Sequence, residues 1–585
     1  MTRAGASWIT AGFAAILALC LLFPGLGRAP FDDPGEGQHA EIAREAWVSG
    51  QLVDLRLNGV RYFDKPPLLY WLIALDYGAW GVSEWSARLP SALGAAAAAA
   101  ATALLGARLL NPAAGLLAGA ALSSCALFLV FGRYVRPETI FVAAIQVGLT
   151  GLLLAVRDSG RVSARGWATL GCASLGLAAL AKDPLGTLGP LAAVAVALAL
   201  AGQLRPLRRW LPPTGLLLML ALGLGWYVVA GVRHAGFLWY TVVDNHLLNA
   251  AGQRHFPDED VPLGTAEFLA VSALGAFPWI VAAVAATASL VRRRAWHDPD
   301  EAPWVALALW TAGLWAVFIV SAFKLPHYGL PAYPAIALLA SRWWIEDTSS
   351  GRRPALLHLA LLAPLAAVLG VIAAGNGAAF VDAVFSATDV YTRKELSGAQ
   401  VSPLPPWSLL QPLVARTALV LAAGALALAL CAWRRAGRWT AAVVAATMLA
   451  VMPSALRALD LVVTGRAVAG MASEVRRLAG PETVLVHEGP IENSGALELY
   501  SGRRPVLVDA RRSVLGIGAT FPDSAEVFWS AEKLREAWLS GRPLLLVTPR
   551  DPRHSLVATL PPDRVKLVRA ENGRWLYASV ANPPR

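Results

Sequence analysis

Thirteen segments of this sequence are long and apolar enough to cross a bilayer as helices, for which about 20 mostly apolar residues are needed. Their approximate bounds are 8–28, 87–107, 112–132, 138–156, 166–181, 184–202, 211–231, 264–290, 303–322, 326–344, 355–376, 407–432 and 439–457. Hydrophobic residues make up 56% of the 585 positions and charged residues 15%, against about 25% charged in soluble domains. Soluble proteins cannot cover so much apolar surface, and disordered chains have the opposite composition. The sequence therefore predicts a polytopic α-helical membrane protein.

Arginines occupy every second connection between these segments. They are Arg3, Arg108, Arg157, Arg161, Arg165, Arg205, Arg208, Arg209, Arg292, Arg293, Arg294, Arg342, Arg352, Arg353, Arg434, Arg435 and Arg438. Because Lys and Arg gather in cytoplasmic loops, we expect a cytoplasmic N-terminus. The segment 8–28 is longer than a signal-peptide core and lacks an A-x-A site, so we expect it to remain as an anchor. Topology thus accounts for most of the net charge of +11, which removes the main argument for a nucleic-acid partner.

The C-terminal segment 466–585 is predicted to be a small soluble α/β domain outside the cytoplasm. The runs TVLVHEG, PVLVDAR and PLLLVTPR are typical of strands, and helical patterns lie between them. A terminal hairpin is expected to turn at Asn572-Gly573. The four cysteines all fall in predicted spans, so they form neither disulfides in this domain nor a metal-binding pattern. The expected division is a membrane domain at 1–465 and a soluble domain at 466–585.

The first outward connection, 28–86, is too long to be a simple linker. We expect it to hold two short helices, the first lying along the membrane surface and the second beginning after Pro66-Pro67. Its carboxylates, histidine, tyrosine and lysine suit a phosphorylated lipid carrier. A carboxylate can activate an acceptor, and a cation can stabilise a leaving phosphate. The polar residues singled out are Asp33, Glu36, His39, Tyr62, Asp64 and Lys65.

Further polar residues interrupt the outward helix ends, where arginine clusters are otherwise missing. An ionisable residue at a membrane-helix end is a functional candidate, and Arg can bind phosphate through two hydrogen bonds. A second long outward loop, 232–263, contributes histidines and acids. The candidates outside the first loop are Arg133, Arg136, Glu138, His246, His255, Lys324 and Tyr328, and Lys182 stands out as another isolated outward lysine.

Four motifs resemble a known family. AEIARE, RLNGVRYFDKPPLLYW, AKDPLG and KLPHYGLPAYPAIALL are similar to bacterial lipid A aminoarabinose transferases. They are also similar to the wider group of polyprenyl-phosphate-sugar glycosyltransferases related to dolichyl-phosphate-mannose protein mannosyltransferases. The resemblance covers most of 28–345. It implies a C-type glycosyltransferase fold of about 13 transmembrane helices, a soluble periplasmic domain and a place in the bacterial inner membrane.

By this resemblance the chain is an inverting glycosyltransferase. The donor would be a sugar on an undecaprenyl-type phosphate, and the acceptor a lipid such as lipid A, a glycan or a protein at the periplasmic face. The residues implied to bind substrate are His39, Tyr62, Lys65, Arg133, Arg136, Glu138, Lys324 and Tyr328. Membrane lipids complete the expected partners.

The catalytic base is the point at which the sequence departs from the family. The family's catalytic Asp falls at Gly35, and its Arg-Tyr pair is replaced by Gln38-His39. We expect Asp33 and Glu36 together to supply the base, since Gly35 gives the loop freedom to bring Asp33 into place. The alternatives are His39 or a different chemistry.

Two further questions concern a metal and rival functions. Asp64 takes the place of a Glu linked to a metal in some relatives, and His246 or His255 could complete a divalent-ion site. No compact ligand spacing supports such a site. The rivals to an enzyme are a flippase for the lipid-linked sugar, for which inverted repeats and mid-membrane charges would be expected, and an inactive scaffold, which Gly35 favours.

Overall fold

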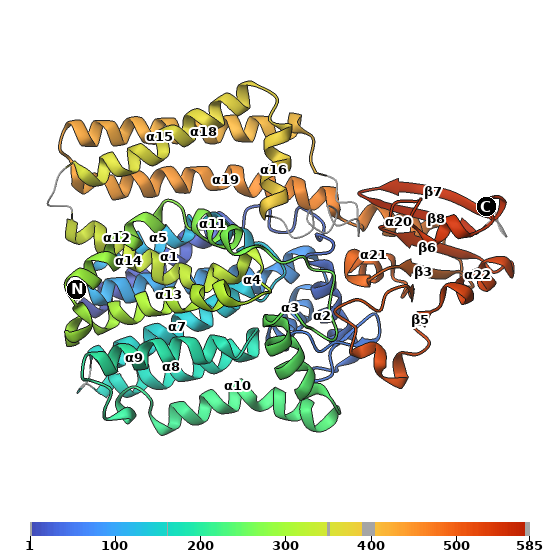
Figure 1. Ribbon diagram of the computed structural model, residues 1–585, viewed down its shortest axis with the longest axis horizontal. Coiled ribbons are helices and arrows are strands. Elements are labelled where there is room, and N and C mark those ends of the chain that lie inside the picture. The colour runs from blue at the N-terminus through green and yellow to red at the C-terminus, as the bar shows by residue number, and fades with distance from the viewer. Residues whose placement is uncertain (1–2, 159, 161, 348–351, 389–403, 580–585) are drawn as a thin grey trace.

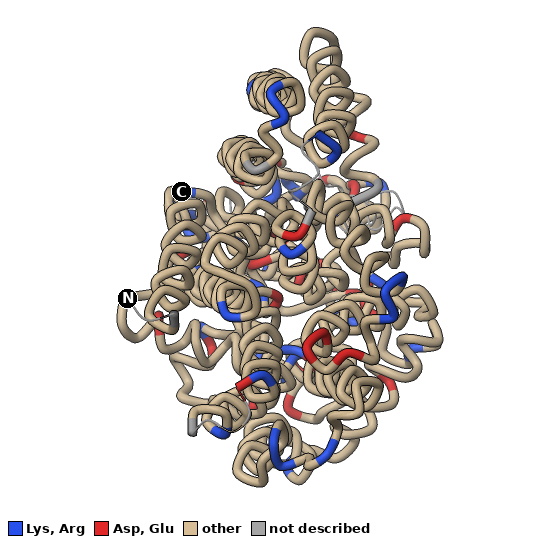
Figure 2. Tube along the Cα trace, turned by 90° about the vertical axis from the view of Figure 1, so that its left-hand side faces the viewer, with Lys and Arg blue, Asp and Glu red and all other residues tan. Residues whose placement is uncertain are grey.

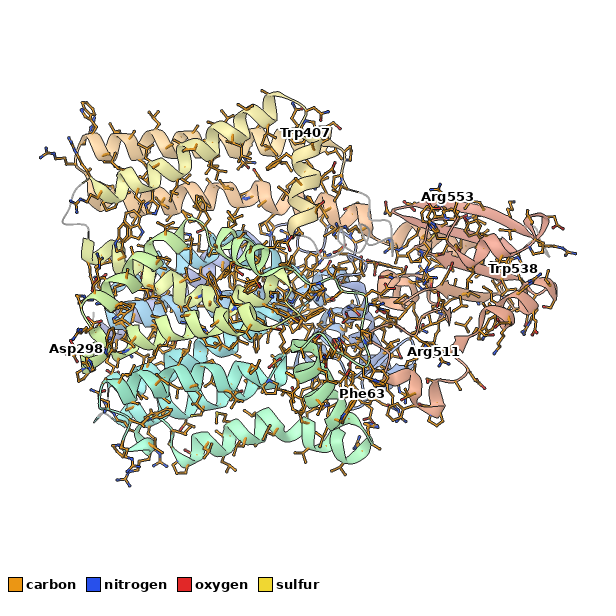
Figure 3. The ribbon with its side chains drawn as sticks, in the orientation of Figure 1. Phe63, Asp298, Trp407, Arg511, Trp538 and Arg553 are labelled. Carbon is orange, nitrogen blue, oxygen red and sulfur yellow. The ribbon has the colours of Figure 1, made fainter. Side chains whose placement is uncertain are left out.

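The computed structural model describes residues 3–158, 160, 162–347, 352–388 and 404–579. A bundle of long helices fills one side of the molecule, and a smaller α/β part lies at one end of that bundle (Figure 1). Asp298, in the connection that also holds Arg292, Arg293 and Arg294, lies at the opposite end (Figure 3). Figure 2 views the molecule from that opposite end. The bundle and the α/β part meet around Phe63 (Figure 3).

Each of the thirteen predicted spans coincides with one or more helices of the bundle. These helices are α1 (Arg3–Leu22), α4 (Glu84–Leu109), α5 (Pro112–Ser123), α6 (Ala126–Gly132), α7 (Glu138–Arg157), α8 (Val162–Ala181), α9 (Leu185–Leu200), α10 (Pro213–Arg233), α11 (Thr265–Gly275), α12 (Trp279–Arg292), α13 (Ala302–Val320), α14 (Tyr333–Asp347), α15 (Arg353–Ala374), α18 (Trp407–Trp433) and α19 (Thr440–Arg466). Within the described residues, eight helices are long and apolar enough to span a membrane, or ten if the bent pairs α5–α6 and α11–α12 each count as one span. A membrane protein is thereby supported, and the total of thirteen spans stays a prediction.

Small residues let the central helices pack closely. A Cβ atom on Gly115 of α5 would lie 2.4 Å from the carbonyl oxygen of Ala103 in α4, so no larger residue fits there. Close approach at small residues is the usual way in which membrane helices associate. Helix α7 is buried along nearly its whole length, whereas α15 is mostly exposed and belongs to the outer layer with α18 and α19 (Figure 1). Helix α7 is therefore the central support on which the polar residues at its N-terminal end are held.

The long loop 28–86 folds into helix α2 (Gly37–Ser49), the strands β1 (Arg56–Leu57) and β2 (Val60–Arg61), and helix α3 (Leu68–Trp80). Helix α3 begins directly after Pro66-Pro67, as predicted. The polar face of α2 is not exposed to solvent, although its position along the membrane surface stays a prediction. Nine of its 13 residues are buried, and a Cβ atom on Gly495 of the α/β part would lie 2.2 Å from the amide nitrogen of Gln38. The α/β part covers the polar face of α2 that the sequence pattern left to solvent.

The α/β part contains one six-stranded sheet in the order β5-β4-β3-β6-β8-β7. Its strands are β3 (Val484–Glu488), β4 (Val506–Val508), β5 (Phe528–Trp529), β6 (Leu544–Thr548), β7 (Val565–Glu571) and β8 (Arg574–Ser579), and its helices are α20 (Ala469–Leu478), α21 (Leu497–Ser501) and α22 (Ala531–Leu539). Strands β3 to β6 pair in parallel, and β8 joins antiparallel. The hairpin between β7 and β8 turns at Asn572 and Gly573, which both have positive φ, as the Asn-Gly pair predicts. The remaining elements that matter for the site are the π-helical η2 (Trp239–Leu248), and the short η5 (Pro326–Ala332) and η8 (Ile491–Ser494).

Candidate functional site

A cavity of about 650 Å³ opens between the α/β part and the ends of the helices that lie next to it. Its walls come from the first loop, from α7, α9, α13, η2 and η5, and from Glu492 of the α/β part. One portion is polar and holds four cationic side chains. The other portion is apolar and runs between α9 and α13. These two portions are described in turn.

The first polar group is centred on Asp64. Its Oδ2 atom accepts a hydrogen bond of 2.5 Å from Lys65 Nζ, and its Oδ1 atom accepts one of 3.3 Å from Arg254 Nη2. Asn245 donates a further hydrogen bond of 3.3 Å to Oδ1. Burial alone would raise the pKa of Asp64, but Lys65 and Arg254 hold it well below its usual range. Asp64 is therefore an ionised carboxylate that positions two cations at the cavity wall.

The second polar group joins α7 to the loop before α9 and to η5. Glu138, the first residue of α7, lies with Oε1 3.1 Å from Lys182 Nζ and 3.2 Å from His327 Nε2. Its Oε2 atom is buried and has no hydrogen-bond partner among the described residues. Lys182 and His327 were not assigned to the site from the sequence. Lys182 could have been assigned from its isolation at a predicted outward helix end. Nothing in the sequence around His327 indicates that it belongs to the site.

The third polar group pairs Asp183 with His246. Asp183 Oδ2 lies 2.9 Å from His246 Nε2, and Asp183 Oδ1 accepts the backbone N–H of Leu185 at 2.6 Å. Burial opposes protonation of His246, but the hydrogen bond to Asp183 outweighs it and raises the pKa of the imidazole. Burial also opposes ionisation of Asp183, and the same pairing lowers the pKa of its carboxyl. His246 therefore has its ring committed to Asp183 and to the Thr241 carbonyl rather than to Asp64.

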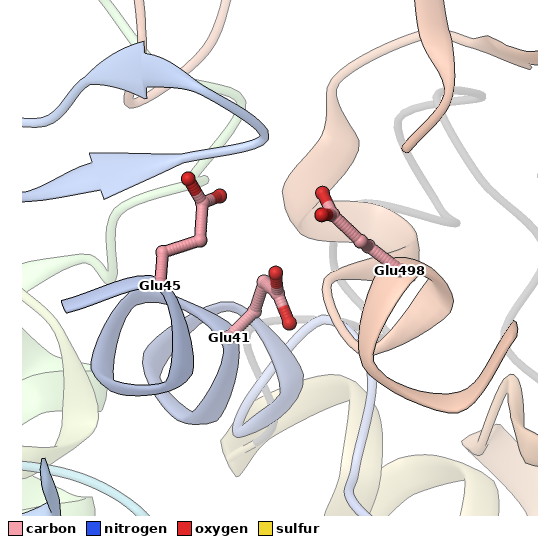
Figure 4. Close-up of side chains that lie close together, drawn as sticks. All are labelled: Glu41, Glu45 and Glu498. Carbon is pink, nitrogen blue, oxygen red and sulfur yellow. The ribbon is translucent and has the colours of Figure 1, made fainter. Parts of the chain in front are cut away.

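The residues proposed for a metal do not come together in the described part of the chain. His255 is absent from the cavity wall and packs its ring against Phe256, with centroids 4.8 Å apart. A different set of three carboxylates does lie close together. Glu41 and Glu45 of α2 face Glu498 of α21 across the interface (Figure 4). Arg44 bridges Glu41 and Glu498, and Arg504 pairs with Glu45 and Glu498, so this group is an ion-pair network that joins α2 to the α/β part.

The two carboxylates expected to act as the base lie outside the cavity wall. Glu36 is fully buried and accepts two hydrogen bonds from the Arg88 guanidinium, 2.8 Å to Oε1 and 2.7 Å to Oε2. Asp33 accepts the backbone N–H groups of Ala496 and Val468 of the α/β part at 3.0 and 3.3 Å. Burial raises the pKa of Asp33 to about 7. The structure therefore places both side chains in structural contacts. Glu36 is the counter-ion of the buried Arg88 in α4, and Asp33 accepts backbone N–H groups at the junction with the α/β part.

Two of the expected phosphate ligands also lie elsewhere. Arg133 donates hydrogen bonds of 2.8 Å to the carbonyl oxygens of Pro24 and Gly25, at the end of α1. Lys324 is 4% exposed and donates to Thr265 Oγ1 at 3.2 Å, and it is not part of the cavity wall. The expected residues that do line the cavity are His39, Tyr62, Asp64, Lys65, Arg136, Glu138, His246 and Tyr328.

The apolar portion of the cavity is formed by α9 and α13. It is lined by small and aliphatic residues, with Trp310 at one side: Gly186, Gly189, Ala192, Ala193, Val196, Leu309, Trp310, Gly313, Leu314 and Val317. A Cβ atom on Gly313 would meet no atom within 4 Å, so this glycine faces open space. The cavity therefore combines a charged compartment with an apolar channel between two membrane helices.

Comparison with known proteins agrees with this architecture. The sequence pattern of the family described as dolichyl-phosphate-mannose-protein mannosyltransferase matches residues 64–228. An undecaprenyl phosphate-alpha-4-amino-4-deoxy-L-arabinose arabinosyl transferase of Pseudomonas aeruginosa is 30% identical over 345 residues, which are 56% of this chain and 60% of that protein. A transferase of the same description from Sodalis glossinidius is 30% identical over 354 residues. The chain thus matches about 60% of the length of these relatives.

Solved structures match over nearly the whole chain. ArnT from Cupriavidus metallidurans bound to undecaprenyl phosphate has a TM-score of 0.79 and 22% identity, covering 98% of this chain and 99% of its own. The same protein in the apo state has a TM-score of 0.76, covering 97% of each chain. The resemblance predicted from the sequence motifs is confirmed, and the chain has the C-type glycosyltransferase fold of ArnT.

Proposed function

We propose that this chain is an inverting glycosyltransferase that moves a sugar from an undecaprenyl-type phosphate to an acceptor on a lipid, glycan or protein. The observation that carries the proposal is the combination of charged and apolar portions in one cavity. A phosphorylated sugar on a prenyl chain has the same two parts. The apolar channel between α9 and α13 fits the chain, and the cations fit the phosphate. The solved ArnT structure with undecaprenyl phosphate supports a ligand of this kind.

The cations of the cavity wall are assigned to the donor phosphate. Lys65, Arg136, Lys182 and Arg254 line the charged portion. When the bond between the sugar and the phosphate breaks, negative charge grows on the phosphate oxygens, and fixed cations stabilise that charge most strongly where water is excluded. The neighbouring hydroxyl of Tyr328 can donate a further hydrogen bond. Attack by the acceptor from the side opposite the phosphate inverts the configuration at the anomeric carbon.

Glu138 is assigned to the sugar. Its Oε1 atom is fixed by Lys182 and His327, and its Oε2 atom is buried without a partner in the described residues. A buried acceptor left without a donor costs about 1–3 kcal/mol. A sugar hydroxyl supplies that donor, so binding of the sugar relieves this cost. Glu138 thereby orients the donor sugar in the cavity.

The membrane orientation and the domain roles follow from the same proposal. By the positive-inside rule we assign the end of the bundle with the arginine-rich connections to the cytoplasm, and the cavity at the other end to the periplasmic face of the inner membrane. Residues 1–465 then form the membrane transferase domain, with the loops 28–86 and 232–263 at the site, and residues 466–585 form a periplasmic domain that closes it. The resemblance links Asp64 to a divalent ion, but two cationic partners, Lys65 and Arg254, already neutralise this carboxylate, and we assign no step to a metal.

The test is the sugar chemistry of the envelope. A strain that lacks this chain should lose one sugar modification and accumulate the corresponding lipid-linked sugar, as measured by mass spectrometry. Lys65→Ala should fail to restore the modification, with turnover lower by about 10²- to 10³-fold, as for other lost transition-state donors. Lys566→Ala, at an exposed lysine on β7, is the matched control and should restore it. If the deletion strain loses no sugar modification, the proposal is contradicted.

A further inference from the structure

The missing catalytic base is the open question in this cavity. The proposed transfer needs a group that takes the proton of the acceptor, but Gly35 stands where the family has its acid, and Asp33 and Glu36 are held in structural contacts. A base must line the cavity, be unprotonated and have a lone pair not already used by another donor.

Three carboxylates of the cavity wall, Asp64, Glu138 and Asp183, are paired with cations or histidines, which makes each of them a weaker base. Asp64 is paired with Lys65 and Arg254, and Asp183 with His246. Glu138 has Lys182 and His327 on its Oε1 atom, and its Oε2 atom, which has no partner among the described residues, is assigned above to the donor sugar. A carboxylate bonded to cations is stabilised in its ionised form and is a correspondingly weaker base.

His39 meets the requirements for a base. The ring lies at the start of α2, lines the cavity and is 2% exposed. Its Nδ1 atom is 2.9 Å from the hydroxyl of Tyr70, and Tyr70 in turn donates a hydrogen bond of 3.2 Å to the hydroxyl of Tyr62. Because Tyr70 has one proton and gives it to Tyr62, it accepts from His39. This arrangement assigns the proton of the neutral imidazole to Nδ1 and leaves the lone pair on Nε2.

The charges of Arg136 and Lys65, which would hold the phosphate, also act on the His39 ring. No hydrogen bond to Nε2 occurs among the described residues. Burial first, and then the charge of Arg136, lowers the pKa of His39 to about 3, with a smaller effect of Lys65 in the same direction. The imidazole is therefore neutral in the empty cavity. A phosphodiester bound to Arg136 and Lys65 offsets the part of this shift that their charges cause, and so raises the pKa of the ring.

We propose that His39 is the catalytic base of this glycosyltransferase and that Tyr70 is its positioning residue, an inference that rests on the proposed function. The acceptor O–H bond breaks and its proton passes to Nε2 of His39. The acceptor oxygen forms a bond to the anomeric carbon. The bond from that carbon to the phosphate oxygen breaks, and its electron pair stays on the released polyprenyl phosphate, which Lys65 and the neighbouring cations stabilise. The imidazolium then returns its proton to water.

The experiment measures turnover and donor binding separately. The purified full-length chain is supplied with a lipid extract from a strain that lacks it, and consumption of the accumulated lipid-linked sugar is followed by mass spectrometry. Binding is measured with undecaprenyl phosphate alone. His39→Gln should lower kcat by about 10²- to 10⁴-fold, the usual contribution of a general base, with affinity for undecaprenyl phosphate unchanged within about twofold. His554→Gln, at an exposed histidine of the α/β part, is the control and should keep full turnover.

Further variants keep the test decisive. Added imidazole should restore part of the turnover of His39→Ala, because the vacated space opens to the cavity, and it should not restore Lys65→Ala. His39→Asn is the second substitution if His39→Gln does not fold. Tyr70→Phe should lower kcat less than His39→Gln and leave KM for the donor unchanged.

Three results would overturn the assignment. Turnover of His39→Gln within about threefold of the wild type excludes His39 as the base while the proposed transferase stands. Equal loss of turnover and of undecaprenyl phosphate binding assigns the ring to binding instead. A loss of kcat in Glu138→Gln that is larger than in His39→Gln assigns the base to Glu138. If the wild-type chain itself transfers no sugar, the proposed function has failed, which is a different outcome from failure of the base.

Discussion

The buried pair of Glu36 and Arg88 gives a prediction that separates structure from catalysis. Their side chains are 0% and 4% exposed. The carboxylate accepts two hydrogen bonds from the guanidinium and another of 2.9 Å from the backbone N–H of Val135. Glu36→Gln removes the charge and leaves the guanidinium buried without its counter-ion, which typically costs about 3–5 kcal/mol. Arg88 also donates to three backbone carbonyls near the end of α1, at Leu26, Ala29 and Pro30.

Those carbonyls still accept hydrogen bonds from the guanidinium, so we expect the free energy of unfolding to fall by about 3 kcal/mol, the lower end of that range. That is roughly a hundredfold in the unfolding equilibrium constant. The assay is unfolding of the purified protein in mixed detergent micelles, together with turnover per folded molecule. Glu36→Gln should lose stability and keep its turnover per folded molecule within about twofold. Glu532→Gln, at an exposed glutamate of α22, should change neither.

A double variant sharpens this prediction. Glu36→Gln with Arg88→Gln removes both charges and keeps a polar side chain at each position, so it should be less destabilised than Glu36→Gln alone, because no uncompensated charge remains. The reasoning is refuted if Glu36→Gln unfolds like the wild type and yet has no turnover. Glu36 would then be the base that the sequence first indicated.

Three other predictions follow from the cavity and the interface. Gly313→Phe should fill the open space beside α13 and raise KM for a long-chain donor more than for a short-chain one, whereas Gly225→Phe, on the exposed face of α10, should not. Lys182→Met should lower kcat/KM by about 10²- to 10³-fold, measured with the lipid extract, and unchanged kinetics would remove Lys182 from the site. Asp33 has a pKa of about 7 in the folded chain, against 3.8 for a free carboxyl. Between about pH 4 and 7 the folded chain therefore keeps a proton that the unfolded chain releases. The free energy of unfolding should fall as pH rises through this range. Asp33→Asn should flatten that fall in a pH series of unfolding measurements, and an unchanged slope would exclude this origin.

Much of the fold could be predicted because it follows from local pattern. The lengths of the apolar segments predict the helices, and the distribution of arginines predicts which connections lie on the same side. Asn572-Gly573 predicts the turn of the final hairpin. The bends within α5–α6 and α11–α12 were not predicted, because each pair reads as one continuous apolar segment. The burial of α2 was missed for a related reason. Its polar face meets the α/β part, which lies more than 400 residues later in the chain, and no local pattern reports such a contact.

The site was predicted in part. The motif around Tyr62, Asp64 and Lys65 does line the cavity. Asp33 and Glu36 lie in the sequence where a catalytic acid is expected. Their partners come from distant segments: the backbone of the α/β part for Asp33, and Arg88 in α4 for Glu36. Arg88 was the available signal, since a charge near the start of an apolar span needs a partner.

Release of undecaprenyl phosphate is the direct measure of the central claim. The purified chain, reconstituted in liposomes with the lipid extract of the deletion strain, should release undecaprenyl phosphate in equal amount to the sugar that appears on the acceptor. Lys65→Ala should do so at a rate lower by about 10²-fold or more. If the lipid-linked sugar crosses the liposome membrane intact and no undecaprenyl phosphate is released, the chain is a transporter and the account is contradicted.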